Sequence, residues 1–388
     1  MYDFDKLTER RNTGSLKWDV TERELPMWVA DMDFETAPEI REAISERAAH
    51  GIFGYNIVTE DWYDAYIGWW SRRHHITFER DWLIFCTGVV PAISSAVRKL
   101  TTVGENVLVQ TPVYNIFFNS IRNNGRNILE SPLVYDGREY HIDFADLEKK
   151  LSDPQTTLML LCNPHNPVGK IWNRETLEKI GELCAKHHVL VLSDEIHCDM
   201  TDPGYEYIPF ASVSETCREN SITCIAPTKT FSIPGIQTAA VMVPNPVIRH
   251  KLNRGLNTDE VAEPNSFAVC AAVAAFEKGE AWLEELRQYL ADNKQLVRDF
   301  VERELPAIRV VPSHATYLLW LDCGYVTDNA TELVHFIREH SGLYLTEGEE
   351  YGKPGKKFIR LNTACPRARL EEGLNRLRDS VRAYAEKR

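Results

Sequence analysis

Between about residues 82 and 243, short β-rich runs alternate with longer amphipathic segments, and this alternation constrains the fold more than any other feature. The runs are WLIFCTG, NVLVQT, NILESP, TLMLLC, VLVLSDE, SITCIAP and TAAVMV. Strands that alternate with helices predict a mostly parallel sheet covered by helices. Because TLMLLC and VLVLSD are apolar at both alternating positions, we expect them to be central strands, buried on both faces. The pattern predicts an α/β fold with a mostly parallel, seven-stranded sheet.

The chain after residue 280 predicts a second, smaller lobe. Its 388 residues exceed what one hydrophobic core usually holds. Gly279-Glu280 opens a long helical segment that runs to about Leu305. Beyond Pro306 come the strand-like runs IRVV and TYLLWLD, a helix around 330–340, the run KKFIRLN and a final helix from Arg367. This order predicts a small α+β domain.

The N-terminal segment predicts one helix that joins the small domain. Thr36 to Glu39 has the shape of a capping box with a proline in the first turn, which predicts a helix from about 37 to 50. We therefore divide the chain into an N-terminal segment and helix over 1–50, a large domain over 51–280 and a small C-terminal domain over 281–388.

Charge and cysteine usage restrict the partners and the compartment. The chain has 57 acidic and 44 basic residues, a net charge of −13, which disfavours nucleic acid and anionic membranes. Its nine cysteines are scattered singly without a C-x-x-C pair, as expected for thiols in a reducing compartment. No apolar run is long enough for a secretory signal or a membrane span. We expect a cytoplasmic protein.

Three polar residues follow predicted strands, where a parallel sheet presents side chains to a crevice. Lys229 comes just after SITCIAP, Asp194 ends the run VLVLSD, and Asn166 lies in the turn NPHNPVG after TLMLLC. Each has an ordinary interpretation on its own: a solvated lysine, a helix-capping carboxylate, a connecting turn. Together they indicate a ligand site at one edge of the sheet.

A glycine turn supplies a candidate phosphate site. Gly88, Val89 and Val90 lie between a strand and a helical segment, where free backbone N–H groups and the helix dipole favour an anion. The dinucleotide motif G-x-G-x-x-G is absent. The turn therefore suits one phosphate rather than a dinucleotide.

The order Asn166, Asp194, Lys229 and Arg360, the last in KKFIRLN, resembles the fold type I pyridoxal-phosphate enzymes related to aspartate aminotransferase. The resemblance spans nearly the whole chain. The segments PMWVADMDF, HGIFGY and SDEIH, and FIRLN followed by CP, further resemble the MalY/PatB group, which are carbon–sulfur β-lyases of the cystathionine β-lyase type.

This resemblance implies that the chain binds pyridoxal 5′-phosphate. It makes Lys229 the catalytic residue and the Schiff-base lysine, and pairs Asp194 with the pyridinium nitrogen. Asn166 would hydrogen-bond the phenolic oxygen, and Arg360 would clamp the substrate carboxylate. An anionic carboxylate keeps the ring nitrogen protonated, and a guanidinium offers two parallel donors to a carboxylate.

The same resemblance implies further contacts with the cofactor. Tyr114 would stack on the ring, and Tyr55 of the partner subunit would reach the phosphate, which implies a homodimer with its sites at the interface. His197 stands where broader aminotransferases place a tyrosine, in agreement with the lyase group. Gln237 replaces a common arginine and Ala226 a common serine. The phosphate would then depend on the Gly88 turn, Thr228 and the partner's Tyr55.

The implied reaction is α,β-elimination, in which L-cystathionine or a cysteine S-conjugate yields a thiol, pyruvate and ammonia. Two alternatives remain open: an aminotransferase on the same fold, and a regulatory role through protein interaction beside the lyase activity. We predict no metal site, because His187, His188, Glu195 and His197 are close in sequence but form no H-E-x-x-H frame.

Overall fold

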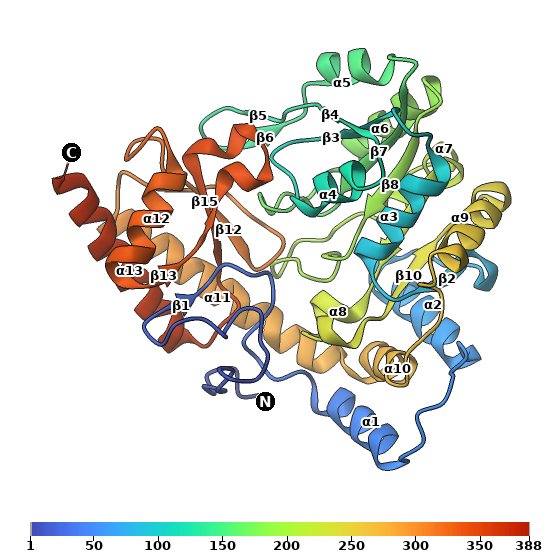
Figure 1. The fold of residues 1–388 in the computed structure, drawn as a ribbon, viewed down its shortest axis with the longest axis horizontal. Helices are drawn as coiled ribbons and strands as arrows, with labels where there is room; N and C mark the ends of the chain where they lie inside the picture. The colour runs from blue at the N-terminus through green and yellow to red at the C-terminus, as the bar shows by residue number, and fades with distance from the viewer. Residues whose placement is uncertain (1, 388) are drawn as a thin grey trace.

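The central sheet of the molecule has the seven predicted strands, in the order β2-β10-β9-β8-β7-β3-β4 (Figure 1). The computed structural model describes residues 2–387. All neighbouring strands run parallel except β10, which is antiparallel to both β2 and β9. The strands are β2 Leu83–Cys86, β3 Asn106–Val109, β4 Asn127–Glu130, β7 Thr156–Cys162, β8 Leu190–Asp194, β9 Ser221–Ile225 and β10 Ala239–Met242. The predicted fold class and the central position of β7 and β8 are confirmed.

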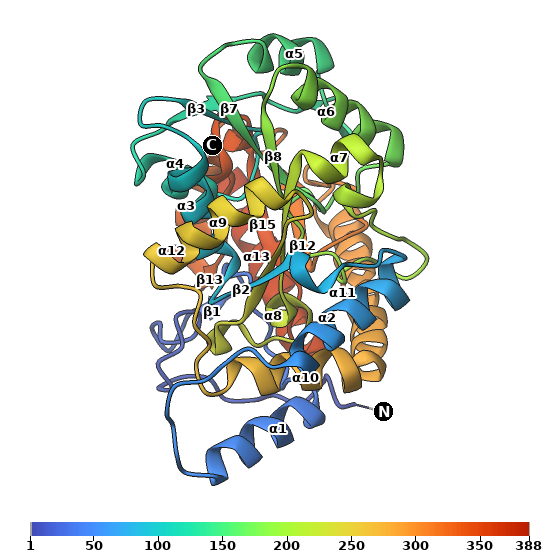
Figure 2. The same ribbon diagram turned by 90° about the vertical axis from the view of Figure 1, so that its right-hand side faces the viewer.

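Helices cover the sheet on both faces (Figure 2). One face packs against α3 Val89–Leu100, α4 Ile116–Arg122 and α9 Pro246–Thr258. The other face packs against α5 Phe144–Leu151, α6 Arg174–Lys186 and α7 Glu215–Glu219, and a neighbouring cluster holds α2 Glu60–His74 and α10 Ala268–Lys278. The short helix α8 Pro227–Thr230 follows β9, and the hairpin β5 Val134–Tyr135 and β6 Tyr140–His141 lies beside the sheet.

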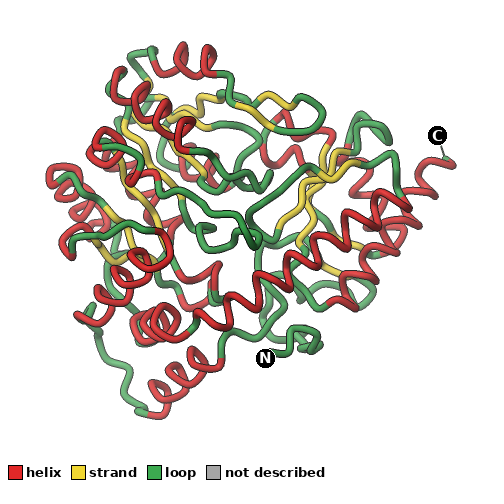
Figure 3. The backbone as a smooth tube through the Cα atoms, turned by 180° about the vertical axis from the view of Figure 1, so that it is seen from behind, coloured by secondary structure: helices red, strands yellow, loops and turns green. Residues whose placement is uncertain are grey.

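The small lobe is built on an antiparallel sheet in the order β11-β12-β15-β14. Its strands are β11 Arg309–Val310, β12 Leu318–Asp322, β14 Thr346–Glu347 and β15 Phe358–Asn362. It packs against α12 Ala330–Ser341, α13 Arg367–Glu386 and the long helix α11 Glu280–Glu304. Seen from behind, α11 runs from the large lobe along the small one (Figure 3). None of the helices in residues 2–387 is both long and apolar enough to cross a membrane.

The N-terminal segment contacts both lobes. Its strand β1 Leu25–Pro26 pairs in parallel with β13 Leu343–Tyr344 of the small lobe, whereas α1 Pro38–Ala49 packs on α10. The predicted capping box is wrong: the Thr36 hydroxyl donates to the Phe231 carbonyl oxygen at 2.6 Å, and Ala37 occupies the N-cap. The Thr36 hydroxyl thus contacts a distant carbonyl oxygen and accepts no hydrogen bond from the first N–H groups of α1. The division at residues 50 and 280 stays a prediction.

Candidate active site

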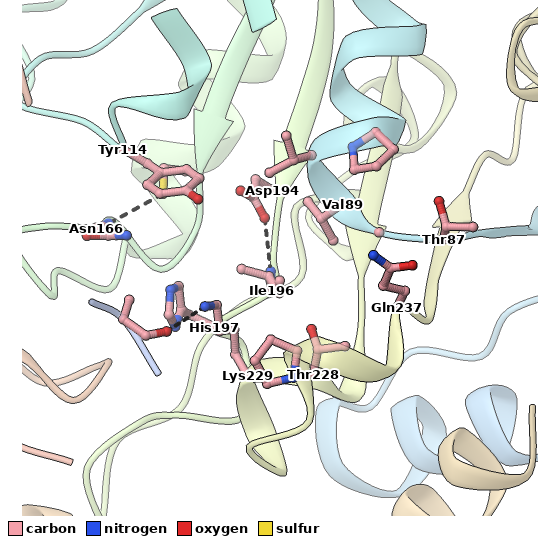
Figure 4. Close-up of a pocket in the computed structure, with 16 residues that line it drawn as sticks. Thr87, Val89, Tyr114, Asn166, Asp194, Ile196, His197, Thr228, Lys229 and Gln237 are labelled. Carbon is pink, nitrogen blue, oxygen red and sulfur yellow. Dashed lines mark hydrogen bonds between the residues drawn. The ribbon is translucent and has the colours of Figure 1, made fainter. Parts of the chain in front are cut away.

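A cavity of about 270 Å³ lies at the carboxyl ends of β7, β8 and β9, beside the N-terminus of α3 (Figure 4). Parallel strands deliver their last residues to one edge of the sheet, which explains why segments distant in sequence meet there. Nine of the predicted site residues line it: Gly88, Val89, Val90, Tyr114, Asn166, Asp194, His197, Thr228 and Lys229.

Lys229 extends from the single turn of α8 into this cavity. Its Nζ donates to the Ala30 carbonyl oxygen at 2.5 Å. Burial lowers the pKa of Lys229 to about 8, against the opposing charges of Asp31 and Asp194. An amine with such a pKa loses its proton close to neutral pH, so it can act as a nucleophile or a base.

Asp194 lies across the cavity from Lys229 (Figure 4). Its carboxylate accepts one hydrogen bond among the described residues, from the Ile196 backbone N–H at 3.2 Å. Burial raises the pKa of Asp194 to about 7, although this hydrogen bond and the charge of Lys229 lower it. A buried carboxylate with one donor is costly, and a cationic ligand group would offset that cost.

Asn166 is held by a tight turn after β7. Its backbone N–H donates to Cys162 Sγ at 3.4 Å. Gly169 ends the turn with a φ of +72°, and a Cβ there would lie 2.0 Å from Ser313 Oγ, so only glycine fits. The turn therefore fixes the Asn166 amide at the cavity wall.

Arg360 reaches the site from β15 of the small lobe. Its Nη2 donates to the Trp28 carbonyl oxygen at 2.7 Å and its Nη1 to Asn166 Oδ1 at 3.4 Å. The guanidinium lies 4.9 Å from the centre of the Tyr351 ring, and its buried Nε has no partner within the described chain. This cation thus lies behind the cavity wall, in contact with Asn166, and its partners are neutral.

Two rings enclose the space between these groups. Burial raises the pKa of Tyr114 to about 12, so its hydroxyl stays neutral. Burial, together with the charges of Lys229 and Arg360, lowers the pKa of His197 to about 3. The His197 Nδ1 is buried without a hydrogen-bond partner in the described residues. His197 is thus a neutral ring with spare hydrogen-bonding capacity.

The opposite end of the cavity suits an anion. Gly88 occupies the N-cap of α3 without a side-chain cap, and Val89 and Val90 form the first turn of this 12-residue helix. Uncapped N–H groups there favour a phosphate. Thr228 and Gln237 complete this flank (Figure 4).

Two predicted site residues, Arg360 and Tyr55, are not among the residues that line the cavity. Tyr55 is fully exposed, in a loop that also exposes Ile52, Phe53 and Ile57. Glu195, considered above as a metal ligand, accepts hydrogen bonds from Ser193 and Tyr207 at 2.8 Å. His187 and His188 lie at the C-terminal end of α6.

Sequence reasoning missed several residues of the site. Ala30, Cys162 and Ile196 line the cavity, and the Tyr317 hydroxyl donates to the Ala30 carbonyl oxygen at 3.0 Å. The segment PMWVADMDF was noted for its resemblance, but no local signal placed its backbone beside Lys229. The contact joins residues 199 positions apart in the chain.

Comparisons with known proteins agree with this geometry. The family model of aminotransferase class I and II matches residues 25–377. The chain is 44% identical to cystathionine beta-lyase PatB of Bacillus subtilis, over 98% of this chain and 100% of that protein. It is 33% identical to protein MalY of Escherichia coli, over 99% and 100%. The crystal structure of cystalysin from Treponema denticola, which contains a pyridoxal 5′-phosphate cofactor, superposes with a TM-score of 0.95 at 34% identity, covering 99% of each chain.

The donor set in the cavity suits such a cofactor. Asp194 forms no salt bridge with any residue from 2 to 387, Lys229 has an amine of lowered pKa, and no side chain caps the N-terminus of α3. The family match and the full-length relatives agree with these groups. The chain therefore belongs to the class I and II aminotransferase family and, within it, to the group that includes PatB and MalY.

Proposed function

We propose that the protein is a pyridoxal 5′-phosphate-dependent carbon–sulfur β-lyase, which cleaves L-cystathionine or cysteine S-conjugates to a thiol, pyruvate and ammonia. The observation that carries the proposal is the cavity in which Lys229 and the under-bonded Asp194 face each other, in a chain related to PatB over its full length. When bound, pyridoxal 5′-phosphate stabilises negative charge at the substrate Cα.

Lys229 moves the proton in this proposal. Its amine would hold the cofactor covalently, and the same amine, when free, would remove the proton from the substrate Cα. Burial keeps the pKa of Lys229 near 8, so the amine is basic and yet partly unprotonated at neutral pH. A sulfur substituent on Cβ then leaves as a thiolate. The ammonia and pyruvate arise by hydrolysis of the remaining fragment.

Three side chains orient the reactants. Asp194 would pair with the ring nitrogen, because this buried carboxylate lines the cavity and forms no salt bridge within residues 2–387. Asn166, together with the neutral His197, would hydrogen-bond the phenolic oxygen, and both residues line the cavity. Arg360 exchanges its neutral acceptor, the Trp28 carbonyl, for the substrate carboxylate, which is a stronger acceptor. Tyr114, which lines the cavity, would stack on the cofactor ring.

The phosphate and the subunit arrangement belong to the same proposal. Gly88, Val89 and Val90 donate backbone N–H groups, and Thr228 adds a hydroxyl. The partner's Tyr55 completes the site in a cytoplasmic homodimer. The exposed apolar side chains around Tyr55 and the nine free cysteines support this arrangement.

An aminotransferase is the second candidate, because the family model that matches residues 25–377 is that of aminotransferase class I and II. The purified holoenzyme should release thiol and pyruvate from L-cystathionine without an added keto acid. Pyruvate would be followed by coupled reduction with NADH, and thiol by a chromogenic disulfide. Product formation that requires a keto acid, with a new amino acid formed from it, would replace the lyase by the aminotransferase. The Lys229→Ala variant controls for contaminating activity.

A further inference from the structure

One carboxylate outside the cavity wall joins the two segments that carry the site. Asp199 is 1% exposed and follows His197 by two residues and Asp194 by five. Its Oδ2 accepts a hydrogen bond from the Thr230 hydroxyl at 3.0 Å. Thr230 directly follows Lys229 in α8. Asp199 thus links the loop after β8 to the turn that carries the lysine.

The same carboxylate is anchored on the helix α2. Trp69 Nε1 donates to its two oxygens at 3.1 and 3.2 Å, and His74 Nε2 lies 2.8 Å from Oδ1. Arg73 Nε lies 3.6 Å from Oδ1. Burial raises the pKa of Asp199, but the hydrogen bond with His74 and the nearby charges outweigh it and hold this pKa below its usual range. The carboxylate is therefore an anionic, fully bonded anchor.

The anchor continues to the long helix that reaches the small lobe. Arg73 pairs with Glu280 at 2.9 Å and with Glu284 at 2.6 Å, both on α11. The Arg73 guanidinium also lies 4.9 Å from the centre of the Trp69 ring. Asp199 therefore connects α8 to a rigid part of the large lobe rather than to a mobile loop.

A metal site is a weaker interpretation of this cluster. His74, Cys198 and Asp199 offer three ligand atoms within 4.8 Å of one another. The Asp199 oxygens, however, already accept from Trp69, His74 and Thr230. A cation would have to break these hydrogen bonds, and burial holds the pKa of the Cys198 thiol well above its usual value. The geometry of a hydrogen-bonded anchor fits better.

α8 needs an external anchor because it is a single turn of four residues. Isolated turns of this length gain little stability from their own backbone bonds. Within α8, Thr228 and Lys229 line the cavity, whereas Thr230 does not and is fully buried. The Thr230 hydroxyl is therefore the polar group through which α8 can be held from the side away from the cavity. A change at Thr230 should therefore alter the direction of Lys229.

We propose that Asp199 is a positioning residue that, through Thr230, fixes the Lys229 amine relative to Asp194. This inference rests on the proposed role of Lys229 as the residue that holds the cofactor and moves the substrate proton. A misplacement of a reacting group by a fraction of an ångström to one ångström lowers kcat, whereas binding through Arg360 is unaffected.

Thr230→Val is the sharpest test, because it deletes the hydroxyl and leaves Asp199 bonded to α2. The holoenzyme should lose kcat by about tenfold to a hundredfold with little change in KM. The visible absorption of the bound cofactor should change its pH midpoint, which a merely structural role would not move. Thr230→Ser should restore both properties. Asp199→Asn should give a larger loss if it folds.

Thr156→Val is the matched control, since it deletes another buried threonine hydroxyl, which donates to the Lys150 carbonyl oxygen at 2.9 Å at the start of β7, at the opposite end of that strand from the cavity. It should lower the thermal midpoint by an amount similar to Thr230→Val while it keeps kcat and the spectral midpoint. The inference is overturned if Thr230→Val retains the wild-type kcat and spectrum, or if Thr156→Val alters them equally. Absence of lyase activity in the wild type would instead overturn the proposed function.

Discussion

The cavity and the closed interior beside it hold the same kinds of buried ionisable groups with different partners. In the cavity, Asp194 accepts one hydrogen bond among the described residues, and Lys229 donates to a neutral carbonyl. In the interior, Glu195 accepts four hydrogen bonds, and Lys294 pairs with Asp202 at 2.6 Å. Burial raises the pKa of both carboxyls to about 7 and lowers that of both lysines to about 8.

The four groups are buried to a similar degree, but they differ in how many partners the protein gives them. This difference distinguishes the structural groups from the functional ones. Glu195 and Lys294 are compensated by the protein itself, so their burial stabilises one packing arrangement. Asp194 and Lys229 have few partners in the protein, so their burial is destabilising. Such groups are retained at functional sites, where a bound ligand supplies the missing partners. Asp194 is the last residue of β8 and lines the cavity, whereas Glu195 follows the strand and is bonded to Ser193, Tyr207 and the Phe210 backbone N–H. The two neighbouring carboxylates therefore differ in their surroundings, and Asp194 is the one at the cavity.

The largest difference should appear between the two buried lysines. Lys229→Ala should lower the rate of pyruvate release roughly 10³-fold or more, because the proton-transferring amine is lost. Lys294→Met should keep kcat and lower the free energy of unfolding by about 1–3 kcal/mol, because Asp202 loses its partner. Steady-state assays and urea titrations measure the two effects. Equal losses of activity in both variants would contradict the comparison.

The two carboxylates should differ in the same sense. Asp194→Asn should reduce kcat about 10²-fold to 10³-fold, because the ring nitrogen loses its anionic partner. The same change should stabilise the cofactor-free protein at pH 8 or leave it unchanged. Glu195→Gln should lower the free energy of unfolding of the cofactor-free protein by about 1–3 kcal/mol, since the amide NH₂ of glutamine would face groups that donate hydrogen bonds to Glu195. A Glu195→Gln variant that stays stable but loses activity would contradict this assignment, because Glu195 would then have the functional role given to Asp194.

A pair of arginines offers a more moderate contrast. Arg360→Lys should raise KM for cystathionine about tenfold to a hundredfold, because a lysine lacks the planar pair of donors. Arg287 is the control: its Nε and Nη2 donate to Thr201 at 2.9 Å, and it pairs with Glu284. Arg287→Lys should leave KM unchanged. An unchanged KM in Arg360→Lys would remove that residue from substrate binding.

The last contrast concerns the pH dependence of stability without cofactor. The pKa of Asp194 is raised to about 7, so the folded state retains a proton that the unfolded state releases above pH 4. Stability should therefore fall as pH rises from about 4 to 7, by at most about 1.4 kcal/mol per pH unit for this group. Urea titrations of wild type and Asp194→Asn should show a shallower decline in the variant. Identical slopes would contradict the raised pKa.

The sequence predicted the regular parts of this site well. All seven strands, the long helix α11 and the final helix α13 lie where periodicity and capping signals place them, because each signal is local. Asn166, Asp194 and Lys229 could be placed at one cavity because parallel strands end at one edge. Their chemical roles came from the resemblance to a family.

Long-range contacts could not be predicted in this way. The bonds of Ala30 to Lys229 and of Thr36 to Phe231 join residues almost 200 positions apart, and neither alters a local pattern. Nothing in the sequence distinguishes Asp199 from an ordinary polar residue after a strand. Its role depends on which helix packs against it, which periodicity does not specify.

The account depends most directly on Lys229 as the residue that holds the cofactor. The holoenzyme should be reduced with sodium borohydride, digested and analysed by mass spectrometry, since reduction makes a lysine–cofactor bond permanent. We predict that the phosphopyridoxyl mass lies on Lys229 in wild type and disappears in Lys229→Ala, while Lys294 remains unmodified. A label on another lysine, or no label in a protein that releases pyruvate from cystathionine, would contradict the account.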